Sequence, residues 1–138
     1  MAIGVNKHKH IMRAMPIIWT LGGPNKRTQF GYSGSVATGA TLLFTGCPRI
    51  SPEFFKAILG HFGSETVAGG FSMTDPTPGG FGQWVEANSK EINGVSLSPR
   101  HASFIAAILV HEGFITSNLK GNAVFLHFTP QRATANSK

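Results

Sequence analysis

The sequence predicts a small single domain of the α+β class. A segment at 98–112 has a capped start and is apolar nearly all round, which is typical of a buried helix. It runs directly into two segments with strand composition, 114–116 and 123–128. Further strand-like segments occur near the start, between 29 and 45. With 138 residues the chain is long enough to bury one core.

Residues 1–28 are expected to form an irregular basic N-terminal arm. Its one apolar run, at 11–21, is broken by Pro16, which argues against a secretory signal. The cluster Gly22-Gly23-Pro24-Asn25 predicts a turn. Because the arm has no acidic residue, its composition also fits a mitochondrial transit peptide. We expect a location inside the cell, with an organelle as an alternative.

The domain itself is expected to span 29–128. Strands are predicted at 29–36 and 40–45, where small and apolar residues alternate. A helix is predicted at 51–62, because Ser51 can cap it and Pro52 fits its first turn. Its apolar residues recur at helical spacing: Phe54, Phe55, Ile58, Leu59 and Phe62.

The next part of the chain is expected to contain three short elements. A strand is predicted at 66–72, and the prolines and glycines of 75–80 predict a loop. A short helix at 81–89 would be anchored by Phe81, Trp84 and Val85. A strand is predicted at 95–97 after the turn signal Asn93-Gly94.

The helix at 98–112 has the clearest signals. Ser98 can cap it, Pro99 fits its first position, His111 suits its last turn and Gly113 can end it. It is far shorter than the ~20 apolar residues that cross a bilayer, so no membrane span is predicted. A turn at 119–122 would join the strands that follow, and 129–138 would be a polar tail.

The net charge of +6 is concentrated at the start of the chain. The first 52 residues contain six basic residues and no acidic one: Lys7, Lys9, Arg13, Lys26, Arg27 and Arg49. From Glu53 onward, basic and acidic residues balance. A basic arm beside a neutral body is typical of proteins that bind phosphates without reading sequence. We therefore expect a nucleic-acid partner, DNA or RNA.

The C-terminal half resembles the winged-helix superfamily. The resemblance rests on Ile108-Leu109-x-x-Glu112-Gly113-Phe114-Ile115 followed by a short hairpin, and it covers 81–128, with 51–62 as the first helix. It implies binding of nucleic acid by the helix before the hairpin. That helix has polar residues only at its start, so the resemblance implies contacts from Arg100 and His101 at the helix tip and from Lys120 at the wing.

Residues 73–130, which overlap this region, also resemble the N-terminal half of the eighth small-subunit ribosomal protein. The shared pattern includes Met73-Thr74-Asp75-Pro76, Ala87-Asn88, Glu112-Gly113-Phe114-Ile115 and Phe125-Leu126-His127-Phe128-Thr129-Pro130. In that family the Met-Thr-Asp-Pro run begins the chain, and a C-terminal half follows that is absent here. This resemblance implies binding of ribosomal RNA within a larger nucleoprotein assembly.

Other function classes remain as alternatives. His111 and His127 could act as acid and base in phosphodiester cleavage, although helix capping and an outward strand position explain them better. Low charge and eleven Phe residues also fit a packing subunit whose partner is a protein. No catalytic residue, cofactor or metal site is predicted, because the acids are scattered and Cys47 is the sole cysteine.

Overall fold

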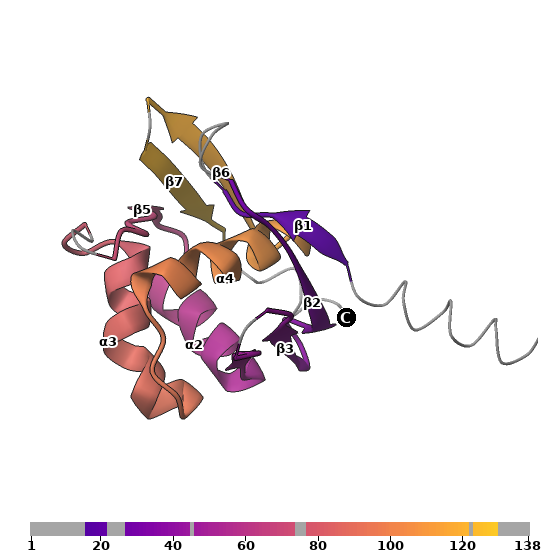
Figure 1. Cartoon of the computed structure of the whole chain (residues 1–138). Coiled ribbons are helices and arrows are strands. Elements are labelled where there is room, and N and C mark those ends of the chain that lie inside the picture. Colours follow the sequence, from indigo (N-terminus) through magenta and orange to yellow (C-terminus); the bar gives the residue numbers. More distant parts are fainter. Residues whose placement is uncertain (1–15, 22–26, 45, 74–76, 122, 130–138) are drawn as a thin grey trace, which may run out of the picture.

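The structure is a computed structural model that describes residues 16–21, 27–44, 46–73, 77–121 and 123–129. These residues form three helices and two antiparallel sheets. The chain ends with two successive helices and a β-hairpin (Figure 1). The predicted α+β class is therefore confirmed.

The N-terminal sheet has four strands in the order β1-β2-β3-β4, which are Ile17–Trp19, Gln29–Ser35, Gly39–Leu42 and Arg49–Ile50. Strands β2 and β3 confirm the two predicted here, although β3 ends three residues earlier than expected. The expectation of an irregular chain up to residue 28 is wrong at β1, because β1 pairs with β2 from Ile17 opposite Gly31 to Trp19 opposite Gln29.

The helices are α2 (Pro52–Phe62), α3 (Phe81–Asn93) and α4 (Pro99–His111). The predicted caps are present, since the Ser51 hydroxyl accepts from the Phe54 amide and the Ser98 hydroxyl from the His101 amide. Helix α3 runs four residues beyond its predicted end and stops where Gly94 adopts a left-handed conformation, with φ of 89°.

The C-terminal sheet has the order β5-β7-β6, from Thr66–Ala68, Ala123–Phe128 and Ile115–Lys120. The prediction of a strand at 95–97 is wrong. The third strand of the C-terminal sheet is β5. Residues 95–97 have no strand partner; the Leu97 amide donates to the buried Ser89 hydroxyl at 2.7 Å. A side chain of α3 therefore satisfies this backbone group in place of a β ladder.

Helix α4 is the centre of the molecule, between the other two helices and the N-terminal sheet (Figure 1). As predicted, it is buried nearly all round: Ala102 and residues 104–109 are all buried. The Phe104 ring packs on Phe30 of β2 and on Phe44, with 4.8 Å between ring centroids in both pairs. The N-terminal sheet thus covers the face of α4 that the helical layer leaves open.

The end of α4 is tied to β2 and the residue after it by a partly buried polar contact. The Tyr32 hydroxyl donates to Oε2 of Glu112 at 2.6 Å, and the Val36 amide donates to Oε1 at 3.0 Å. Burial raises the pKa of the Tyr32 phenol well above its usual value, and the hydrogen bond to Glu112 raises it further. The phenol therefore keeps its proton and remains a donor to the carboxylate.

Candidate nucleic-acid interface

The structure describes five of the nine residues that the sequence predicts to bind nucleic acid. Lys7, Lys9, Arg13 and Lys26 lie outside the described residues. The other five lie at two separate places. Arg27 and Lys120 lie by β1 and the hairpin, whereas Arg49, Arg100 and His101 lie around the starts of β4 and α4. Strands β1 and β4 are opposite edges of one sheet, about 14 Å apart at the usual strand spacing.

The first place is built around Trp19 at the end of β1. The Arg27 guanidinium lies over the Trp19 ring, 5.4 Å from its centroid. Two hydrogen bonds between Thr20 and Thr28 hold this pair together: the Thr20 amide donates to the Thr28 carbonyl at 2.8 Å, and the Thr28 amide donates to the Thr20 hydroxyl at 2.7 Å. They join the described chain on the two sides of residues 22–26, a stretch of sequence that includes Lys26.

A cavity of about 340 Å³ opens beside Trp19 and Arg27, between β1 and the outer part of the hairpin. Its other lining residues are Thr20, Leu21, Ser117, Asn118, Leu119 and Val124. Trp19 is 51% exposed and Leu119 is 45% exposed, so two large apolar side chains face solvent here. None of the described residues that line this cavity is acidic. The cavity therefore combines an exposed aromatic ring, a cation and neutral hydrogen-bonding groups.

The hairpin side of this cavity is fixed by a chain of polar contacts. The His127 ring binds Asn118 Oδ1 through Nε2 and Thr66 Oγ1 through Nδ1. Lys120 follows Leu119 at the end of β6 and is exposed, but side chains alternate along a strand, so it leaves the opposite face of the ribbon. Lys120 is thus near the cavity without lining it.

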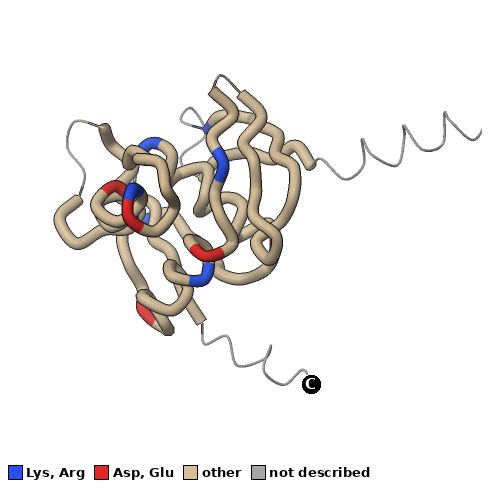
Figure 2. Tube along the Cα trace, turned by 90° about the horizontal axis from the view of Figure 1, so that it is seen from below, with Lys and Arg blue, Asp and Glu red and all other residues tan. Residues whose placement is uncertain are grey.

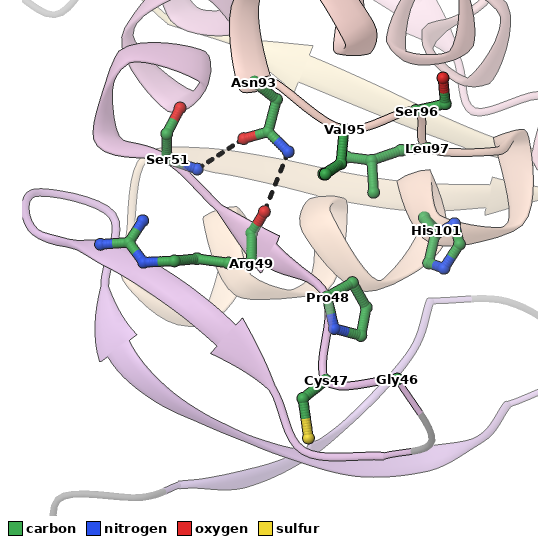
Figure 3. A pocket seen from close by; sticks show the side chains of 10 residues that line it. All are labelled: Gly46, Cys47, Pro48, Arg49, Ser51, Asn93, Val95, Ser96, Leu97 and His101. Atoms are coloured by element: carbon green, nitrogen blue, oxygen red, sulfur yellow. Dashed lines mark hydrogen bonds between the residues drawn. The ribbon is translucent and has the colours of Figure 1, made fainter.

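The second place surrounds a cavity of about 440 Å³ that is lined by ten residues, including Arg49, Asn93 and His101 (Figure 3). Asn93 ties its wall together, because it accepts from the Ser51 amide and donates to the Arg49 carbonyl. The Arg49 guanidinium points away from His101 in Figure 3 and donates to the Thr38 carbonyl at 3.3 Å. The two predicted residues line one cavity, but their polar ends do not converge.

His101 belongs to the cap of α4. Its Nδ1 accepts from the Ser98 amide at 3.0 Å, while the His101 amide donates to the Ser98 hydroxyl. Burial lowers the pKa of His101 from its usual value, and the nearby charge of Arg100 adds to the effect. The neutral ring is the form that can accept at Nδ1. This structural role was not predicted, since Glu or Gln is the usual third residue of such a cap.

The histidine and cysteine side chains that the structure describes show no arrangement of a nucleophile with a base. Both ring nitrogens of His127 have partners, whereas exposed His111 lies edge-on to Tyr32 with 6.3 Å between ring centroids. The Cys47 thiol is exposed, and in Figure 3 its sulfur points away from His101 with Pro48 between them. No contact in this set supports the phosphodiesterase alternative.

The charge of the described residues is nearly balanced. They contain six basic and five acidic residues, and Figure 2 shows the two colours mixed along the chain without a large patch of either. The other six basic residues and Asp75 lie outside the described residues, so these segments hold most of the net charge. Three of those six precede β1 in sequence and Lys26 directly precedes Arg27.

Sequence reasoning missed Trp19, Asn118 and Leu119 as candidate site residues. Trp19 fell in an apolar run that predicts burial, and Asn118 and Leu119 fell at or beside a predicted turn. The available signal was Lys26-Arg27, because a basic pair seven and eight residues after a tryptophan can return to it through the turn predicted at 22–25.

Comparison with known proteins gives no assignment: no family model, no curated protein and no solved structure matches this chain. Among the described residues, no helix has the length and apolar character to cross a membrane. Within the same ranges, no group of three or more His, Cys, Asp or Glu side chains could hold a metal ion.

Proposed function

We propose that this protein binds nucleic acid, mainly through phosphates, and that its binding surface lies where β1 meets the hairpin. The observation that carries the proposal is the Trp19–Arg27 pair beside an open cavity whose described lining residues include no acid. In the sequence, the basic residues Lys7, Lys9 and Arg13 precede β1, and Lys26 lies between β1 and Arg27. Phosphates attract such clustered cations without any requirement for a base sequence.

The arrangement of the C-terminal half supports part of the winged-helix resemblance. Helix, strand, two helices and a hairpin follow one another as α2-β5-α3-α4-β6-β7. Helix α4, however, is buried against the N-terminal sheet along its length and offers only its two ends, at Arg100 and His111, to solvent. A helix that enters a major groove must expose a whole face. The proposed contacts therefore come from β1, the hairpin and the basic segments, with the exposed Arg100 at the tip of α4 as an outlying contact.

The salt dependence of binding tests this proposal. For the double variant Lys26→Ala with Arg27→Ala, we expect the slope of log K against log salt to become shallower by about 1.4 for a single strand, because each lost phosphate contact removes about 0.7. The measurement is a fluorescence anisotropy titration of a labelled oligonucleotide at several salt concentrations.

The matched control is Lys56→Ala with Lys90→Ala, which removes the same charge from exposed positions on α2 and α3. Its slope is expected to equal that of the wild type. Equal slopes for both double variants and the wild type would refute the surface proposed here, and absence of any salt-dependent binding would refute the function.

A protein partner is the second candidate. A Cβ added at Gly31 would lie 3.5 Å from Leu43 and 3.7 Å from Ile17, so these two apolar side chains flank the same point of β2, and they are 42% and 67% exposed. Exposed apolar clusters are frequent at protein interfaces. Association through such a cluster would be nearly indifferent to salt, so the same titration separates the two candidates.

A further inference from the structure

We propose that the cavity beside Trp19 holds an unpaired nucleobase, so that the protein prefers single-stranded nucleic acid. This inference rests on the proposed function and adds to it the chemical form of the ligand. Its basis is one juxtaposition: a half-exposed indole, a guanidinium over it, and polar groups of β6 on the facing wall.

The indole supplies the flat surface that a base requires. Ile17 and Trp19 are exposed while Ile18 between them is partly buried, so β1 turns one face inward and presents Trp19 outward. Arg27 and the Thr20–Thr28 hydrogen bonds fix this part of the strand. Bases stack on aromatic rings and on guanidinium planes in single-strand recognition, and the arrangement therefore offers both surfaces at once.

The facing wall supplies hydrogen bonds for the edge of a base. Ser117 lies on the same strand face as Leu119 and offers its hydroxyl, whereas Asn118 lines the cavity from the strand face that carries His127. Leu119 and Val124 pair across β6 and β7 and form an apolar wall. A cavity of about 340 Å³ lies in the size range of small-ligand sites. Neutral polar groups beside an apolar wall suit an uncharged base better than a second phosphate.

Single strands are favoured because a duplex hides its bases. In a paired helix each base is stacked between its neighbours, and bringing it onto Trp19 would require unstacking. The alternative route to duplex sequence, a helix in the major groove, is closed by the N-terminal sheet over α4. Thus the exposed ring is the feature of the proposed surface that contacts bases.

The test compares four probes of equal length: single-stranded oligo-dT, single-stranded oligo-U, an abasic strand with the same phosphates, and a blunt DNA duplex. We expect oligo-dT or oligo-U to bind about tenfold more tightly than the abasic strand, since a stacked base contributes on that order. Trp19→Ala should remove this difference and leave abasic binding unchanged. Trp19→Phe should restore part of it, whereas Val95→Ala, which shortens an exposed apolar side chain elsewhere, should leave all four affinities unchanged.

Fluorescence gives a readout that does not depend on affinity. The chain has two tryptophans, so Trp84→Phe leaves Trp19 as the sole indole and Trp19→Phe leaves Trp84. Base-bearing single strands should quench the first variant and not the second, and quenching of the wild type serves if Trp84→Phe does not fold.

Each outcome decides between the two proposals. Equal binding of the abasic and base-bearing strands, or tighter binding of the duplex, would overturn the base site while leaving phosphate binding standing. Failure of every probe to bind would overturn the proposed function itself. Salt-insensitive self-association that Trp19→Ala abolishes would assign this surface to a second copy of the chain and refute the base site.

Discussion

Replacing Phe104 with alanine is expected to lower the free energy of unfolding by about 3–5 kcal/mol. Phe104 lies on α4 and is 8% exposed, in contact with the rings of Phe30 and Phe44. Truncation removes buried apolar surface and two ring contacts, and it leaves a cavity between the helix and the N-terminal sheet. Urea denaturation followed by circular dichroism measures the effect.

The neighbouring residue provides the control. Ser103 is partly exposed on the same helix, and its hydroxyl donates only to the Arg100 carbonyl. Ser103→Ala is expected to change the free energy of unfolding by about 0.5 kcal/mol or less. If Phe104→Ala costs no more than this control, the N-terminal sheet does not cover α4, and groove binding by that helix becomes available again.

Replacing Gly82 with alanine is expected to destabilise the protein by about 1–3 kcal/mol, despite the better helix propensity of alanine. Gly82 lies in the first turn of α3, and its amide donates to the Gly69 carbonyl at 2.7 Å. An added Cβ would lie 2.0 Å from the Gly70 carbonyl oxygen and 3.2 Å from Pro99. The first neighbour is backbone, so it cannot move aside cheaply.

Gly60→Ala is the control that separates the effect of the steric clash at Gly82 from the effect of helix propensity. It is an exposed position of α2, and a Cβ there would meet nothing within 4 Å. Gly60→Ala is therefore expected to stabilise the protein by up to about 1 kcal/mol. Thermal denaturation of both variants checks the pair, and the same sign of change in both would contradict the close approach of α3 to the Gly69–Gly70 backbone.

The elements that the sequence predicts well are those whose signals are local. Ser98 and Pro99 mark the start of α4, and its apolar character all round predicts its burial. Strand β7 has the predicted bounds, with Leu126 and Phe128 buried on one face. These features depend on neighbours within a few residues, which the sequence displays directly.

The predictions that are wrong or incomplete concern features that depend on residues distant in the sequence. Strand β1 is only three residues long and exists because β2 pairs with it, whereas residues 95–97 have strand composition but meet a serine side chain. Charge predicted Arg27 as a candidate residue, but the sequence could not show that Trp19 remains exposed beside the hairpin. Likewise, the sequence suggests that His101 is a surface residue free to contact a ligand. The structure shows instead that its Nδ1 accepts a hydrogen bond from the Ser98 amide in the helix cap.

Mapping amide chemical shifts during titration with a single-stranded oligonucleotide tests the central claim most directly. The account predicts that the shifts concentrate on β1, on residues 27–29 and on the outer hairpin around 117–120, with smaller shifts at the outlying Arg100 and little change around Arg49. Shifts confined to the cavity of Arg49 and His101, or no shifts at all at low salt, would contradict it.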